Sequence, residues 1–99
     1  MRNKKDREPQ SMKQAIDSFL KVNGLDSVYK EKQVLAKWEE IVGKPVALRT
    51  DYVTIKERTL YLEMNSAVMR DELFKHKSKL IELINKEAGF EMVNAVFLK

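Results

Sequence analysis

Two short segments, residues 52–56 (YVTIK) and residues 59–64 (TLYLEM), alternate apolar and polar side chains with the period typical of half-buried strands. The apolar positions are Val53 and Ile55 in the first segment and Leu60, Leu62 and Met64 in the second. Because only Glu57 and Arg58 separate them, the segments are predicted to pair as a β-hairpin. Neither residue favours a positive φ, so a loop longer than a tight two-residue turn is expected.

Two amphipathic helices are predicted ahead of this hairpin. The first is capped by Ser11 and stops at Asn23 and Gly24, and the second covers residues 27–42 and ends at Gly43. The apolar faces consist of Met12, Ala15, Ile16, Phe19 and Leu20 in the first helix, and Val34, Leu35, Trp38, Ile41 and Val42 in the second. Both faces are expected to pack with the sheet into one core.

A third helical region follows the hairpin, capped by Asn65 or Ser66 and ended by Gly89. Its apolar stripe is interrupted around residues 76–78, so either one kinked helix or two consecutive helices are expected. Residues 92–98 resemble a strand that returns in parallel to the strand before the helix. The predicted order is α-α-β-β-α-β, an α+β domain with a three-stranded sheet packed on helices.

The composition of the chain limits the classes of protein to which it can belong. The 99 residues are 43% hydrophobic and 34% charged, with no cysteine and a net charge of +4. Chain length and composition predict one ordered domain over residues 11–99. Residues 1–10 have no apolar residue after Met1 and include Pro9, which predicts a flexible basic tail there. The absence of cysteine favours a reducing compartment, and no apolar run approaches the roughly 20 residues of a membrane helix. A cytoplasmic protein without a membrane span or secretory signal is expected.

The sequence offers little material for catalysis. It has one histidine, His76, which lies between lysines and is interpreted as a helix-flank residue. Gly24, Gly43 and Gly89 each follow a predicted helix, so we interpret them as helix caps rather than as a phosphate-binding loop. We therefore expect no enzymatic activity, cofactor, metal ion or small-molecule substrate.

Two groups of basic residues are candidates for nucleic-acid contact. The tail group is Arg2, Lys4, Lys5 and Arg7, and the helical group is Lys75, Lys77, Lys79 and Lys86. Within the second group, Lys75, Lys79 and Lys86 are spaced to share one helix face, where they could meet phosphates. The alternatives are a tail that only improves solubility and a solvated helix face on which Glu82 and Glu87 pair with the lysines.

Aromatic residues suggest two further binding surfaces. Trp38, the one tryptophan, is either a core anchor or a partly exposed ring that docks a partner. Tyr52 and Tyr61 are predicted on the sheet face opposite the apolar one. There they stack on nucleic-acid bases, pack against a covering helix, or line the sheet face.

The order of motifs from residue 38 onward resembles the DciA family of bacterial replicative helicase loaders. It begins with W-x-x-I-V-G at residues 38–43, ahead of the hairpin. The other residues that carry the resemblance are Val46, Ala47, Thr50, Leu60, Leu62, Ser66, Glu72, Leu73, Leu80, Ile84, Asn85, Gly89, Val93 and Val96. The resemblance spans residues 38–98 and implies a KH-like fold, although the G-x-x-G loop of true KH domains is missing.

The resemblance also implies a function. Family members bind the hexameric, ATP-dependent replicative DNA helicase and help to place it on single-stranded DNA. By this resemblance the helix of Trp38, with Lys37 and Ile41, is the candidate helicase contact, and the two basic groups would bind DNA weakly. The alternative function is a small RNA-binding module that uses the sheet tyrosines and the basic tail.

Overall fold

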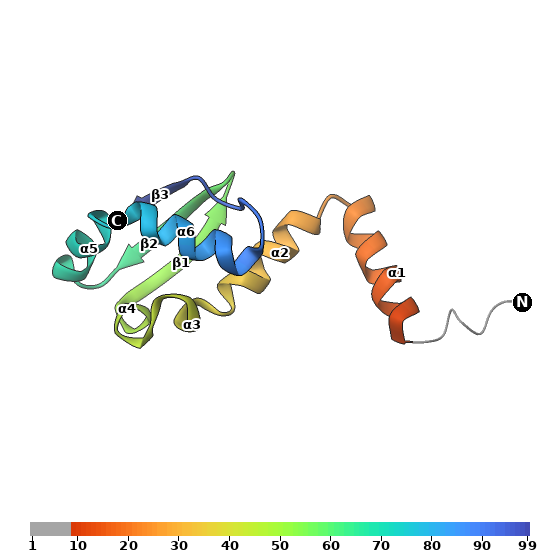
Figure 1. The fold of residues 1–99 in the computed structure, drawn as a ribbon, viewed down its shortest axis with the longest axis horizontal. Helices are drawn as coiled ribbons and strands as arrows, with labels where there is room; N and C mark the ends of the chain where they lie inside the picture. The colour runs from red at the N-terminus through yellow and green to blue at the C-terminus, as the bar shows by residue number, and fades with distance from the viewer. Residues whose placement is uncertain (1–8) are drawn as a thin grey trace, which may run out of the picture. The chain divides into compact units, whose positions relative to one another are not determined.

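A computed structural model describes the backbone of residues 9–99 and the side chains of residues 12–99 (Figure 1). The basic tail group lies outside the described residues. The chain divides into two compact units, Met1–Lys30 and Glu31–Lys99. The first unit contains helix α1 (Pro9–Val22) and the start of α2 (Asp26–Leu35), and the second contains the remaining elements.

Helix α1 begins earlier than predicted and ends where predicted. It starts at Pro9, so Ser11 lies inside the helix and is not its cap. A proline is compatible with the first turn because its missing N–H would have no intrahelical partner there. At the other end, the amide of Leu25 donates to the carbonyl of Leu20 at 2.8 Å, and Gly24 has φ +69°. This left-handed stop confirms the predicted end of the helix.

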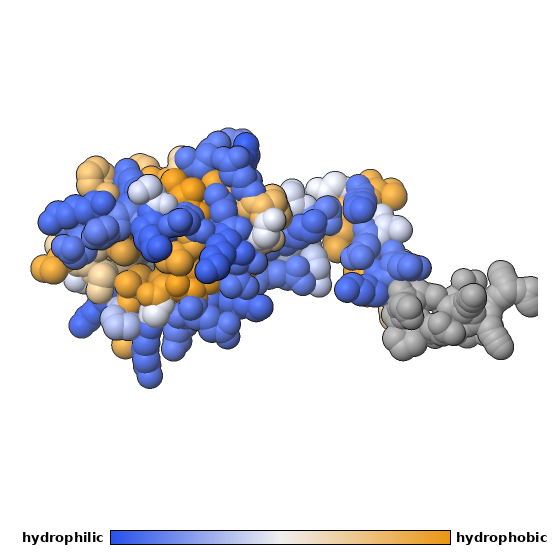
Figure 2. Space-filling model, in the orientation of Figure 1, coloured by the Kyte–Doolittle hydropathy of each residue, from blue (hydrophilic) through white to orange (hydrophobic). Residues whose placement is uncertain are grey.

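Within its own unit, the apolar face of α1 is not covered by another described element. The exposed fractions of Met12, Ile16 and Phe19 are 65%, 49% and 59%, and the buried core contains no described residue of this helix. Figure 2 shows apolar side chains on the surface of α1 beside hydrophilic ones. The packing of this face against the sheet therefore stays a prediction.

The predicted helix over residues 27–42 is also wrong, because the structure breaks it at Ala36 and Lys37. Helix α2 ends at Leu35, α3 spans Trp38–Val42, and a further helix, α4, spans Lys44–Leu48. Alanine and lysine are good helix formers, so local propensity does not account for the break. The packing of α3 does: the new helix contacts α4 and α6 and places Trp38 in the core. Lys37, at the break, also forms an ion pair with Glu87 of α6 at 3.3 Å.

Strands β1 (Thr50–Lys56) and β2 (Thr59–Met64) form the predicted antiparallel hairpin. Lys56 pairs with Thr59, and Glu57 and Arg58 have φ values of 48° and 62°. The connection is thus a two-residue turn with two positive φ values, and the expectation of a longer loop is wrong. A residue outside the hairpin stabilises the turn: the amide of Asn94 donates to the carbonyl of Arg58 at 2.9 Å. This bond offsets part of the cost of about 1 kcal/mol or more per left-handed residue.

The third helical region is split, as the interrupted stripe predicted. Helix α5 spans Ala67–Phe74, and α6 spans Lys77–Ala88. The hydroxyl of Ser66 accepts from the amide of Met69 at 3.2 Å and caps α5, while Gly89 at φ +86° ends α6.

The last strand, β3 (Ala95–Leu98), is shorter than predicted and pairs in parallel with β2. The sheet order is β1-β2-β3, which gives a mixed α+β fold with a three-stranded sheet and confirms the predicted order of elements. The KH-like likeness remains a prediction.

The core lies on one face of this sheet. Its buried residues are Val34, Trp38, Ile55, Leu60, Leu62, Met64, Leu73, Leu80, Ile84, Met92, Val93 and Val96. Leu60, Ile84 and Val93 are fully buried, so β2, α6 and the segment before β3 meet at the centre of the core.

Candidate functional site

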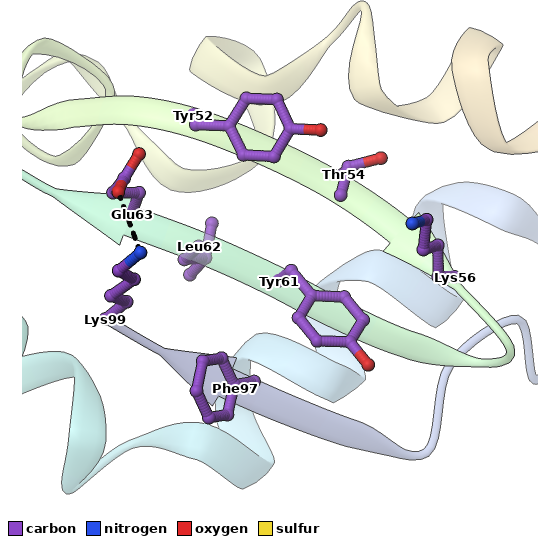
Figure 3. A pocket seen from close by; sticks show the side chains of 8 residues that line it. All are labelled: Tyr52, Thr54, Lys56, Tyr61, Leu62, Glu63, Phe97 and Lys99. Carbon is purple, nitrogen blue, oxygen red and sulfur yellow. Dashed lines mark ion pairs between the residues drawn. The ribbon is translucent and has the colours of Figure 1, made fainter.

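The side of the sheet opposite the core contains a hollow of about 460 Å³ (Figure 3). Alternate residues of β1 reach it because successive strand side chains point to opposite faces. The lining residues are Tyr52, Thr54, Lys56, Tyr61, Leu62, Glu63, Phe97 and Lys99. We call this surface the open face. Its volume lies within the range of small ligand sites, although the site is a shallow surface on a sheet rather than an enclosed cavity.

Three aromatic rings, one from each strand, lie across the open face. The strand register places Thr54 opposite Tyr61 and Tyr61 opposite Phe97. The ring centroids of Tyr61 and Phe97 are 5.7 Å apart with an interplanar angle of 52°. Tyr52 is 56% exposed and Phe97 is 53% exposed, so two of the rings present much of their surface to solvent. The prediction that Tyr52 and Tyr61 share this face is confirmed.

Charged groups lie on the two sides of the aromatic row, toward the two ends of the strands. Lys56 is at the hairpin end, where it pairs with Thr59, and Lys99 is at the other end beside Glu63 (Figure 3). The ammonium of Lys99 lies 3.6 Å from a carboxylate oxygen of Glu63. Both partners are solvent-exposed, so this ion pair contributes little to stability. The lining therefore carries two cations and one anion.

The predicted helicase contact lies partly in the core. Trp38 is only 7% exposed, and its indole N–H donates to the hydroxyl of Thr50 at 3.2 Å. The same hydroxyl donates to the carbonyl of Val46 at 2.8 Å, which ties α3, α4 and β1 together. The ring is thus largely buried and acts as a core anchor, while its helicase contact stays a prediction. Ile41 is half-buried, and Lys37 is exposed beside its ion-pair partner Glu87.

The predicted helical lysines do not share one helix. Lys75 follows the end of α5, before the break, so the expectation that it continues the face of Lys79 and Lys86 on α6 is wrong. Lys75 and Lys79 form surface ion pairs with Glu72 and Glu82 at 3.6 and 3.3 Å. Lys77 lies 4.3 Å from the ring centre of Phe74, and Lys86 is exposed. Local carboxylates thus partly neutralise this group.

Other candidate chemistry is sparse in the described part of the chain. His76 is exposed at the start of α6, and its side chain makes no capping hydrogen bond there. Residues 9–99 contain no group of three or more histidine, cysteine, aspartate or glutamate side chains that could hold a metal ion. Burial raises the pKa of the Glu31 carboxyl on α2, and the nearby Lys32 opposes that shift. None of the described helices is long and apolar enough to cross a membrane.

Asn85 has a structural role that the sequence did not reveal. Its amide oxygen accepts from the backbone N–H groups of Met92 and Val93 at 2.8 and 2.9 Å. Its amide nitrogen donates to the carbonyl of Val93 at 3.0 Å. One side chain thus satisfies three backbone groups in the segment that leads into β3, where Met92 and Val93 are buried. The one available signal was an asparagine four residues before the glycine that ends α6.

Residues 11–98 match the model of the protein family described as Dna[CI] antecedent, DciA. Comparisons with curated proteins and with solved structures found no match. The matched segment includes α2 and most of α1 as well as the sheet and its helices. It therefore extends the resemblance seen from residue 38 onward to nearly the whole chain. This protein belongs to the DciA family.

Proposed function

We propose that this protein binds the replicative DNA helicase and assists its loading onto single-stranded DNA. The observation that carries the proposal is the family match over residues 11–98, which is consistent with a replication role at the helicase-loading step. The sequence contains no glycine-rich nucleotide-binding loop, so the protein would act through binding and without a chemical step of its own.

Binding alone can drive loading if the protein has different affinities for two states of the helicase. A ligand shifts a conformational equilibrium only by the ratio of its affinities for the two states. A tenfold preference for a helicase state that admits DNA is worth about 1.4 kcal/mol and shifts the population by the same factor. ATP hydrolysis by the helicase would supply the energy for later translocation.

The helicase contact is proposed on the exposed surface of α3. Lys37 is 54% exposed at its side chain and lies directly before α3, so its charge can reach a partner. Ile41 adds a half-buried apolar contact on the same helix. Trp38 would support this surface from below through its bond to Thr50 rather than by touching the helicase.

The direct test is a reconstitution with the replicative helicase of the same organism. We expect the tagged protein to retain the helicase on a column, and to increase helicase-dependent unwinding that starts from a closed circular single strand. Lys37→Glu should weaken retention, and Lys21→Glu on α1, which reverses another exposed lysine, serves as the matched control. Absence of both retention and stimulation would contradict the proposal.

The basic groups are proposed as secondary DNA contacts that hold the backbone electrostatically. Removing one lysine or arginine that binds a phosphate should reduce the slope of log K against log salt by about 0.7 for single strands. Replacing Arg2, Lys4, Lys5 and Arg7 with alanine tests the tail, and replacing Lys79 and Lys86 tests α6. An unchanged slope in either variant would exclude that group as a DNA contact.

A further inference from the structure

We propose that the open face of the sheet is a stacking surface for single-stranded DNA. Unpaired bases would lie on the rings of Tyr52, Tyr61 and Phe97, with the phosphates contacting Lys56 and Lys99. This inference rests on the proposed function in one respect, the choice of DNA as the nucleic acid. It adds a binding surface distinct from α3 and from both basic groups.

The first argument is the composition of the face. Each strand contributes one aromatic ring, and Tyr52 and Phe97 are more than half exposed although large rings are usually packed in a core. Every base has a flat apolar surface, so exposed rings bind bases with little regard to sequence. Such tolerance suits a protein that must accept any single strand on which a helicase is placed.

The second argument is the arrangement of charge. Lys56 and Lys99 lie on opposite sides of the row of rings, as Figure 3 shows, so the backbone of a strand whose bases stack on the rings could reach a cation on either side. A row of rings between cations is the pattern of surfaces that combine base stacking with backbone attraction. An acidic protein partner would account for the two lysines but not for the three aromatic rings between them.

The third argument concerns strandedness. In a duplex the bases are already stacked on one another, so their flat surfaces are not available to protein rings. The open face is formed by neighbouring side chains of a pleated sheet and contains no helix that could enter a groove. The same rings therefore favour single strands over duplex.

A substitution of Glu63 tests directly whether a phosphate binds at Lys99. Its carboxylate holds Lys99 at 3.6 Å and would repel a phosphate at the same place. Glu63→Gln removes the repulsion and frees the ammonium, so single-stranded DNA should bind several-fold more tightly. If the face were only a solvated surface, this change would leave DNA affinity unaltered.

The experiment is a fluorescence anisotropy titration of the full chain with a labelled thymine homopolymer of about 15 nucleotides. Removal of one stacking ring typically costs about 1 to 3 kcal/mol, so Tyr52→Ala and Phe97→Ala should each weaken binding by about tenfold. The conservative variants Tyr52→Phe and Phe97→Tyr keep a ring and should keep the affinity. Phe19→Ala, which removes an exposed ring from α1, is the matched control.

Salt dependence separates stacking from charge. Tyr52→Ala and Phe97→Ala should weaken binding without changing the slope of log K against log salt, whereas Lys56→Ala should reduce the slope by about 0.7. Circular dichroism melts of each variant verify that the sheet is intact.

Several outcomes would overturn the inference. They are no binding of the unmodified chain at low salt, unchanged affinity in both alanine variants, or tighter binding of the matching RNA, which would favour an RNA-binding module instead. Retention of the helicase is measured in a separate experiment from DNA binding. A chain that binds DNA through this face but not the helicase contradicts only the proposed function, and the converse result contradicts only this inference.

Discussion

Helices α1 and α6 show the same amphipathic pattern and differ in exposure. In α6, Leu80 is 4% exposed and Ile84 is fully buried, whereas in α1 the corresponding stripe at Ile16 and Phe19 is about half exposed. Their periodicity predicts a helix correctly in both cases. The difference is that α6 has fixed partners in its unit, where it packs against α3, α5 and β3.

The comparison shows what an apolar stripe can and cannot predict. Periodicity reports that one side of a helix gains free energy when it is covered, but it does not identify the surface that covers it. The free energy of unfolding should therefore respond very differently to the same substitution in the two helices.

The largest effect is expected at the centre of α6. Ile84→Asp places an unpaired carboxylate in the core, which should cost more than about 4 kcal/mol and leave much of the protein unfolded. Urea denaturation followed by circular dichroism measures the loss. The milder Ile84→Val should cost only about 1 kcal/mol, and a similar stability for both variants would contradict the buried position.

A smaller loss is expected at Asn85, which fixes the segment between α6 and β3. Asn85→Ala removes three hydrogen bonds to the backbone and leaves the N–H and C=O of Val93 without this partner, while the Met92 amide keeps the carbonyl of Phe90; the cost should be about 2 to 4 kcal/mol. Asn85→Asp keeps the two accepted bonds and loses the donated one, so it should be less damaging. Equal losses in the two variants would mean that the donated bond to Val93 dominates.

Trp38 should affect stability more than partner binding. Trp38→Phe keeps an aromatic ring but loses the hydrogen bond to Thr50, so the free energy of unfolding should fall by about 1 to 2 kcal/mol. Helicase affinity should change by less than the roughly 2 kcal/mol of an interface hot spot. Blue-shifted emission that acrylamide does not quench would verify burial, and a red-shifted, quenchable emission would contradict it.

The smallest effect is expected on α1. Ile16→Asp replaces a half-exposed side chain outside the core, so the free energy of unfolding should change by no more than about 0.5 kcal/mol. This is the same substitution as Ile84→Asp, which makes the two a matched pair. A loss above about 2 kcal/mol at Ile16 would show that the face of α1 is covered in solution.

Much of the fold was predictable because local signals and packing agree. The hairpin, the cap at Ser66 and the stop at Gly89 each follow from residues within a few positions of the feature. The errors arise where distant contacts override local preference. The turn at Glu57 and Arg58 is hydrogen-bonded to residues more than 30 positions later in the chain. No pattern in the neighbouring sequence predicts these hydrogen bonds.

The site was less predictable than the family for a physical reason. Residues that carry the family resemblance, such as Trp38, Leu60, Ile84 and Val93, are buried. They therefore report on the fold rather than on a binding surface. The period of two placed Tyr52 and Tyr61 on one face, but Phe97 joins them only through the parallel pairing of β3 with β2.

The contacts of the hairpin turn have a consequence for the order of folding. The β1–β2 pair is local in sequence, whereas β3 must close a loop of some thirty residues, which costs more chain entropy. We therefore expect the turn to form first and to present the carbonyl and guanidinium of Arg58 to the incoming segment, where Asn94 and Glu91 bind them. By binding the segment just before β3, the strained turn would then fix the register in which the last strand pairs.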